Sequence, residues 1–404
     1  MPKIFVQIAA YRDPELLSTI KHCLERAVNP ENLTFGIAYQ DEVFLDLYDS
    51  DPRFKIIKIP YKDSQGACWA RHKTNELYNR EDFTLQIDSH MRFIPNWDHA
   101  LLQMWKDLKD PKAVLTSYPA QYEPQQEEKD WKTEPHICNV HNFKDGQTEQ
   151  RPKSVNLLKR DTPFQAIHVA AGFIFGPGSI ITDVPYDPEF YFLGEETALT
   201  VRLYTHGYNL FHPHRIILYH HYERKEQPKH WSDDKEWGKK SNLAKERLDC
   251  LLGRSTKHDL GKYTLGNVRT LEEFQNYSGI DYKRKIVHLD TIEGKEPPVD
   301  LTDTKKWSYE MKTYKKIVQW NYDKIDKCED PRFWAMIFKD QNDQELHRVD
   351  ILHKDNSEII DGKVREKEFE FKYYTPAQIP STFLIWPYSE SKQWLTNTKW
   401  QICA

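Results

Sequence analysis

Short apolar runs alternate with amphipathic stretches through the first 120 residues. The apolar runs are typical of buried strands and fall at 3–10, 33–40, 54–61, 83–90 and 113–119. Apolar residues recur with helical spacing between them, which predicts helices at about 16–27, 68–79 and 96–109. Asp13-Pro14-Glu15 precedes the first of these, as expected at a helix start. This alternation predicts an α/β fold with a mainly parallel sheet and helices on both faces.

The second half of the chain is less regular. Residues 121–165 are polar and predict a long loop or lid. After them, the pattern predicts strands at 169–180 and 215–221, and helices at 195–206 and 233–252. Two prolines within 295–303 indicate a linker, and the short β segments that follow predict a β-rich module. We therefore expect a first domain at 1–255, a connecting segment at 256–304, and a β-rich accessory domain at 305–404.

Composition and charge narrow the class of protein. Of the 404 residues, 39% are hydrophobic and 29% charged, which is typical of a soluble globular protein. The formal net charge is −5 and no long Lys/Arg run occurs, so an extended nucleic-acid-binding track is excluded. No apolar window approaches the 18 residues of a membrane span, and no signal-peptide core follows the N-terminus. Six cysteines lack metal-ligand spacing. Because no secretory signal is seen, we expect them to be free thiols and the location to be cytoplasmic.

The sharpest local motif is Asp88-Ser89-His90, at the end of the fourth predicted strand. Residues two apart in an extended chain project to the same side, so Asp88 and His90 could hold one ion together. Oxygen and nitrogen donors suit Mn²⁺ or a similar divalent cation. The alternative is an ordinary strand end with solvated side chains.

Histidines gather further along the chain, at positions 212, 214, 220 and 221. His220 and His221 are adjacent, and neighbouring side chains on a strand point to opposite sides. Only one of the two can therefore face a given site. A distant histidine that completes an Asp/His pair is the functional interpretation, and a histidine cluster without metal is the alternative.

Two further features are candidates for chemistry. Glu195 and Glu196 follow Gly194 at the start of a predicted helix, where acids also stabilise the helix dipole. A carboxylate there could act on a reacting hydroxyl. Arg71 lies on a predicted helix and could pair with phosphate oxygens, although a solvated arginine is the commoner case.

Several motifs in order resemble the cytoplasmic polypeptide N-acetylglucosaminyltransferases, which add GlcNAc to a hydroxyproline. They are VQIAAYRDPEL, GIAYQDE, GACWARHKTNELY, LQIDSHMRF, AAGFIFG, FYFLGEET, LYHHYERK and SNLAKERLDCLLG, spread over about residues 3–255. The chain is also similar to the mucin-type polypeptide N-acetylgalactosaminyltransferases, a retaining GT-A group with an Asp-x-His metal motif. The resemblance implies a GT-A fold, a UDP-sugar donor, most simply UDP-GlcNAc, and Mn²⁺ or another divalent cation.

Carried over by position, the resemblance assigns roles to individual residues. Asp88 and His90 would bind metal and diphosphate with His221 as third ligand, although His220 stands where the relatives have Gly and is the other candidate. Glu195 aligns with an acceptor-side carboxylate and Glu196 follows it. The implied nucleotide-sugar contacts are Ala9, Tyr11, Arg12, Gln40, Arg71, Asp88, Ser89, Gly172 and Phe192, the last in place of a Trp.

The resemblance therefore implies a retaining glycosyltransferase that acts on a polypeptide hydroxyl. Two alternatives are a transferase with a glycan or lipid-linked acceptor and a nucleotide-sugar-binding protein without turnover. The β-rich accessory domain is a candidate acceptor-binding module.

Overall fold

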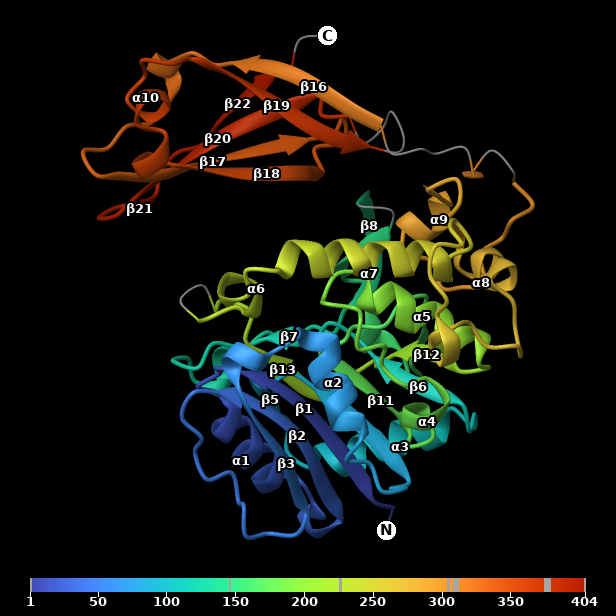
Figure 1. Ribbon diagram of the computed structural model, residues 1–404. Coiled ribbons are helices and arrows are strands. Elements are labelled where there is room, and N and C mark those ends of the chain that lie inside the picture. Colours follow the sequence, from blue (N-terminus) through green and yellow to red (C-terminus); the bar gives the residue numbers. More distant parts are fainter. Residues whose placement is uncertain are drawn as a thin grey trace. The chain divides into compact units, whose positions relative to one another are not determined.

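The computed structural model describes residues 2–144, 147–224, 227–303, 306–307, 312–373 and 379–402. The chain divides into two compact units, 1–307 and 308–404, each with its own core (Figure 1). Residues 256–304, expected as a connecting segment, lie in the first unit.

The first unit is built on an eight-stranded sheet, ordered β10-β12-β6-β11-β4-β1-β2-β3. Its strands are β1 (Ile4–Tyr11), β2 (Leu33–Asp41), β3 (Phe54–Pro60), β4 (Phe83–Ile87), β6 (Ala113–Thr116), β10 (Phe164–Gln165), β11 (Phe173–Pro177) and β12 (Asn209–His212). The neighbours β4, β1, β2 and β3 are parallel. β11 runs antiparallel between β4 and β6, so its first residues lie at the edge where the parallel strands end.

Helices cover both faces of this sheet. On one face, α1 (Leu16–Arg26) and α3 (Trp97–Asp107) bury Ile20 and Leu101 against alternate residues of β1 and β2, such as Ile8. On the other face, α2 (Ala67–Asn75) buries Ala70 against Ala38, whose side chain points the opposite way to that of its neighbour Ile37. Side chains alternate between the two sides of each strand, so the sheet contributes to an apolar core on each face. The predicted α/β fold with a mainly parallel sheet is confirmed.

Smaller elements complete the first unit. β5 (Met91–Phe93), β13 (Leu218–His220) and β7 (Ala120–Gln121) form a three-stranded sheet. Within 121–165, where the sequence predicts a loop or lid, β8 (Ile137–Lys144) and β9 (Gln147–Lys153) form a hairpin. The other elements are α4 (Ile180–Asp183), α5 (Glu195–Thr205), α6 (His230–Asp233), α7 (Trp237–Leu251), α8 (Leu271–Ser278), β14 (Ile280–Asp281), β15 (Ile286–Val287) and α9 (Leu289–Ile292).

The second unit is a two-sheet β module. β16 (Lys312–Gln319) pairs with β19 (Glu366–Tyr373). The other sheet contains β17 (Pro331–Lys339), β18 (Glu345–Leu352), β20 (Thr382–Ser389), β21 (Gln393–Trp394) and β22 (Thr398–Gln401), and α10 (Ser357–Ile360) lies in the same unit. A core that includes Trp334, Phe338, Phe369 and Phe371 joins the two sheets. The predicted β-rich character of the C-terminal part is confirmed.

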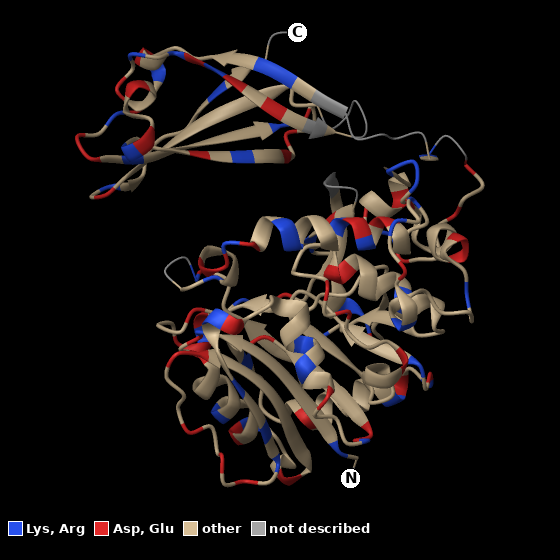
Figure 2. Cartoon of the chain, in the orientation of Figure 1, with Lys and Arg blue, Asp and Glu red and all other residues tan. Residues whose placement is uncertain are grey.

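The distribution of charged residues agrees with the small formal net charge of −5. Lys and Arg are interspersed with Asp and Glu along the described elements (Figure 2). None of the described helices combines the length and apolar character needed to span a bilayer. The free thiols are Cys23, Cys68, Cys138, Cys250 and Cys328, while Cys403 lies outside the described residues.

Candidate active site

A pocket of about 540 Å³ opens at the edge of the central sheet where β1, β2 and β4 end. The start of α5 and the segment around α6 form other parts of its wall. This is where ligands bind in parallel α/β sheets. The pocket brings together most of the residues predicted from the sequence: Ala9, Tyr11, Gln40, Arg71, Asp88, Ser89, His90, Gly172, Phe192, Glu195 and Glu196. Two predicted site residues, Arg12 and His221, do not line it.

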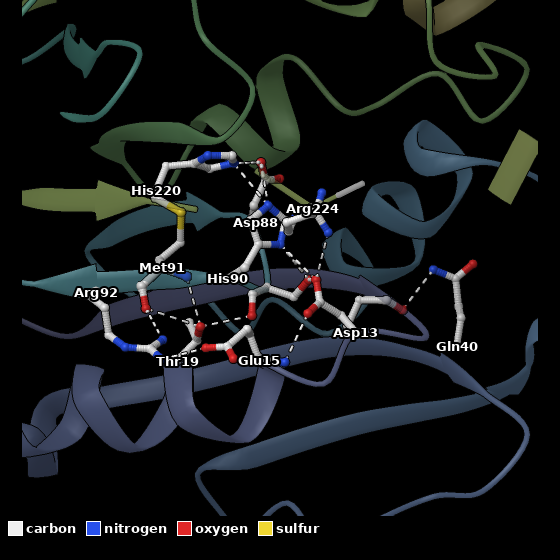
Figure 3. A network of polar contacts seen from close by, with 12 residues as sticks. Asp13, Glu15, Thr19, Gln40, Asp88, His90, Met91, Arg92, His220 and Arg224 are labelled. Atoms are coloured by element: carbon white, nitrogen blue, oxygen red, sulfur yellow. Dashed lines mark hydrogen bonds and ion pairs between the residues drawn. The ribbon is translucent and has the colours of Figure 1, made fainter. Parts of the chain in front are cut away.

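Three side chains in the pocket converge as metal ligands would. The Nε2 atom of His220 lies 3.0 Å from Nε2 of His90 and 3.2 Å from Oδ2 of Asp88 (Figure 3). The His90 Nε2 atom lies 4.0 Å from the same carboxylate oxygen. Two imidazole nitrogens and one carboxylate oxygen suit Mn²⁺ and similar divalent ions, and three protein ligands leave positions for substrate oxygens.

Of the two adjacent histidines, His220 is the one that faces Asp88 and His90. Its side chain joins Asp88 and His90, whereas His221 points away and places its Nε2 atom 3.2 Å from Glu123. The two histidines separate because adjacent residues at the end of β13 project to opposite sides. The structure therefore makes His220, and not the predicted His221, the candidate third ligand.

Electrostatics at the cluster favour a charged Asp88 carboxylate beside a neutral His220. Burial opposes ionisation of Asp88, but the hydrogen bond to His220 and the charge of Arg71 lower its pKa below the usual range. Burial lowers the pKa of His220 to about 4, although Asp88 favours its charged form. The Nδ1 atom of His220 is buried without a hydrogen-bond partner. A neutral imidazole with Nε2 directed at the cluster is the form that binds metal.

The lack of a side chain at Gly172 leaves space for the carboxylate of Asp88. A Cβ at this position would lie 2.8 Å from Oδ2 of Asp88, closer than Cβ atoms approach other heavy atoms. The glycine stands immediately before the antiparallel strand β11. The sequence prediction that Gly172 lines the site thus has a direct steric reason.

Asp13 was not among the residues predicted from the sequence, although it follows the first strand. Its side chain is 2% exposed, and Oδ2 lies 2.7 Å from Nδ1 of His90. Ser89 Oγ and Arg224 Nη1 donate to the same oxygen at 2.7 and 3.1 Å. Burial raises the pKa of Asp13, but these contacts with His90 and Ser89 outweigh it and lower the pKa to about 2.

Arg71 is a buried cation between two acids. It donates to Oδ1 of Asp88 at 2.9 Å and to Glu195 through its other terminal nitrogen. The side chain of Glu195 is only 4% exposed, and burial raises its pKa despite the positive charge of Arg71. The main role of Glu195 in the structure is therefore its ion pair with Arg71.

Glu196 is the carboxylate that faces the pocket more openly, with 31% of its side chain exposed. It accepts hydrogen bonds from Tyr118 Oη at 3.1 Å and the Ala171 amide at 2.9 Å, and His168 lies 3.7 Å away. Burial opposes its ionisation, but the contacts with His168 and with the Ala171 amide lower its pKa. Tyr118 and His168 line the pocket, and the sequence pattern gave no signal for either.

The end of the pocket beside β1 and β2 carries Ala9, Tyr11, Gln40 and Ser64. Gln40 is 2% exposed, and its Nε2 atom donates to the Ala10 carbonyl. Its Oε1 atom is buried and has no hydrogen-bond partner within the protein.

Arg12 takes a different place from the one predicted. Its guanidinium lies 4.3 Å from the centre of the Tyr61 ring, and Nη1 pairs with Asp233 at 2.9 Å. Tyr11 Oη also donates to Asp233, at 2.7 Å. Arg12 therefore holds α6 against the end of β1 and does not line the pocket.

Exposed apolar side chains and polar groups both line the pocket. Phe192, Leu193 and Trp231 are 42%, 50% and 40% exposed, and the rings of Phe192 and Trp231 lie 5.4 Å apart. Residues 147–150 of the β8–β9 hairpin supply amide, hydroxyl and carboxylate groups. Such a lining suits a ligand with an apolar ring face and hydrogen-bonding groups beside it.

Comparison with protein families places most of the first unit in one family. The model of the family described as "Glycosyltransferase (GlcNAc)" matches residues 3–52 and 46–284. No curated protein gives a significant match.

Solved structures similar to this chain share little sequence with it. One is GalNAc-T7 with UDP, GalNAc and Mn²⁺, with 14% identity and a TM-score of 0.44 over 68% of this chain and 54% of that one. The alignment thus spans about half the length of GalNAc-T7. Another is residues 1–349 of S. aureus TarS with UDP-GlcNAc, with 12% identity and a TM-score of 0.40 over 76% and 78% of the chains. A longer TarS structure has 11% identity and a TM-score of 0.35 over 99% and 86%.

Proposed function

Because the chain belongs to the glycosyltransferase (GlcNAc) family, we propose that it transfers GlcNAc from UDP-GlcNAc to a hydroxyl group of a polypeptide, with retention at the anomeric carbon. The observation that carries the proposal is the convergence of Asp88, His90 and His220 in the pocket at the end of the parallel strands.

The donor's nucleoside fits the end of the pocket beside β1 and β2. The unpartnered Oε1 of Gln40 accepts a hydrogen bond from the N–H of the uracil ring. Ala9 and Tyr11 form the wall beside it. A base that offers no N–H at this position leaves Gln40 unsatisfied, which gives the site a preference for uracil.

The diphosphate then lies towards Asp88. Asp88, His90 and His220 would hold a divalent cation such as Mn²⁺, which would supply positive charge to stabilise the leaving diphosphate. Arg71 keeps Asp88 ionised and fixed in place by its hydrogen bond at 2.9 Å. Arg224 also lines this part of the pocket and adds positive charge.

Glu196 is the group best placed to act on the acceptor. Its carboxylate accepts a hydrogen bond from the acceptor hydroxyl and orients the oxygen towards the anomeric carbon. The bond from that carbon to the diphosphate breaks as the new glycosidic bond forms on the same face, and the proton of the hydroxyl passes to Glu196. Tyr118 and the Ala171 amide hold Glu196 in position.

The acceptor enters past Phe192 and Trp231. A polypeptide segment with a ring-containing residue can lay its apolar face on these side chains, while Gln147 and Gln150 pair with its backbone amides.

The test measures UDP release from a panel of UDP-sugars, with Mn²⁺ or with a chelator, for the wild type and Asp88→Asn. We expect Mn²⁺-dependent release from UDP-GlcNAc, stimulated by peptide acceptors and abolished in the variant. Stimulation by saccharides and not by peptides would reject the polypeptide acceptor. Failure to turn over UDP-GlcNAc with any acceptor, together with failure to bind UDP, would reject the proposed donor reaction.

A further inference from the structure

Asp13 joins three segments of the site through one buried carboxylate. Its Oδ2 atom meets His90 Nδ1, Ser89 Oγ and Arg224 Nη1 within 3.1 Å (Figure 3). Its Oδ1 atom accepts the backbone N–H of Glu15 at 3.0 Å, just before α1 begins. The two oxygens therefore have separate tasks: one serves the helix start, and the other serves the pocket.

The contact with Asp13 determines which nitrogen of His90 carries the proton. A carboxylate that receives hydrogen bonds from Ser89 and Arg224 can only accept, so Nδ1 of His90 must be the donor. In a neutral imidazole the lone pair is then on Nε2. That atom is the one directed at His220, 3.0 Å away.

We propose that Asp13 is a positioning residue that holds His90 in the tautomer able to bind a divalent cation. Carboxylates that accept from a ligating histidine fix its ring orientation and raise its basicity. Arg224 offsets the charge of the buried carboxylate and so keeps it an acceptor. The inference rests on the metal site of the proposed function.

Support of the turn that precedes α1 is the other task that the structure gives Asp13, and Asp13→Asn separates the two. Asparagine, like aspartate, accepts a hydrogen bond from the backbone N–H two residues on, so its oxygen can keep the Glu15 amide. The amide nitrogen then replaces Oδ2 and donates to Nδ1 of His90, which moves the His90 proton to Nε2. The proton occupies the position that the metal needs, while the helix start is preserved.

The experiment measures Mn²⁺ binding to the full-length protein, without donor, from the paramagnetic resonance signal of free Mn²⁺. We expect Asp13→Asn to weaken Mn²⁺ binding about 10- to 100-fold. Asp98→Asn is the matched control, because Asp98 is also buried and accepts the backbone N–H groups of Val28 and Asn29 but does not line the pocket. It should bind Mn²⁺ as the wild type does.

A second measurement reads the tautomer in the metal-free protein. The ¹⁵N shifts of His90, assigned by comparison with His90→Gln, should show a protonated Nδ1 in the wild type and a protonated Nε2 in Asp13→Asn. A folded Asp13→Asn protein with wild-type Mn²⁺ affinity and an unchanged tautomer would overturn the role of Asp13. Absence of Mn²⁺ binding by the wild type would overturn both this role and the metal site. Transfer that persists without Mn²⁺, with both shifts as expected, would overturn the proposed catalysis and leave the role of Asp13 standing.

Discussion

The Nε2 atoms of His90 and His220 lie 3.0 Å apart although 130 residues separate them in the chain. They meet because β5 and β13 pair antiparallel, with His220 opposite Met91. Two ring nitrogens that present lone pairs at this distance repel each other, and a cation bound by both would relieve that conflict.

Substitution should distinguish the two adjacent histidines. His220→Gln should weaken Mn²⁺ binding at least about 100-fold, since even outer-shell changes cost 10- to 100-fold. His221→Gln should bind Mn²⁺ normally, because its ring faces Glu123. Titration calorimetry with Mn²⁺ checks both variants. Equal losses in both would contradict the assignment of His220.

Removal of Arg71 should destabilise the first unit. Arg71→Gln leaves the buried carboxylate of Glu195 without its cation, which should cost about 3–5 kcal/mol of unfolding free energy. Arg53→Gln is the control, because the pair of Arg53 with Asp51 is more exposed and should be worth no more than about 1 kcal/mol. Urea unfolding measures both. A smaller loss for Arg71→Gln than for Arg53→Gln would show that Glu195 does not depend on this charge.

His212 should make stability fall in mild acid. Its Nδ1 donates to the Thr116 carbonyl and its Nε2 accepts from the Cys138 amide, a pattern that needs the neutral ring. Burial lowers its pKa from 6.5 to about 4, so the unfolded state binds the proton more readily. The stability is fully present above pH 6.5 and is lost as the pH falls to 4, by about 3 kcal/mol.

The measurement for His212 is the unfolding free energy between pH 7 and pH 4. His212→Gln can keep one donor and one acceptor but has no proton to gain. Its stability should therefore decline less than that of the wild type over this window. Parallel curves for the two proteins would show that His212 is not the titrating group.

A methyl group at Gly172 should impair the site without unfolding the protein. In Gly172→Ala the new Cβ would lie 2.8 Å from Oδ2 of Asp88 and push the carboxylate away. We expect weaker Mn²⁺ and UDP binding in calorimetry, with little change in the thermal midpoint. Gly238→Ala is the control, because a Cβ there meets no atom within 4 Å.

Substitution of the two acids at the start of α5 should affect different properties, activity for Glu196 and stability for Glu195. Glu196→Gln should lower kcat by about 10²- to 10⁴-fold if Glu196 acts on the acceptor hydroxyl, while stability changes little. Glu195→Gln should instead lower stability, because it removes the partner of Arg71. Transfer kinetics and urea unfolding of both variants check the assignment. Full activity in Glu196→Gln would exclude it from the reaction.

Much of the first unit could be predicted from periodicity. The predicted strand at 33–40 and helix at 195–206 differ from β2 and α5 by one residue at one end. Asp88 and His90 were also predicted to lie together, and the structure brings them together, because their spacing places both on one side of the strand end. Such local patterns can be read from the sequence because the spacing of buried residues determines both the type of element and which of its side chains face the core.

Other features depended on contacts distant in sequence. The β8–β9 hairpin is too polar to show strand periodicity, and its edge pairing only appears in the fold. Asp13 resembled a helix-start residue, and its role at His90 follows from a neighbour 77 positions away. The choice of His220 over His221 required the register of β13 against β5, which no single strand encodes.

The same register makes the site unequally tolerant of insertions and deletions. Loss of one residue just before β13 would bring His221 opposite Met91, onto the side that His220 now occupies. A ligand of the same chemistry would thus be retained by the tandem histidines. Asp88 and His90 have no such duplicate, since Ile87, Ser89 and Met91 flank them, and a shift of one residue in that turn would remove both donors at once.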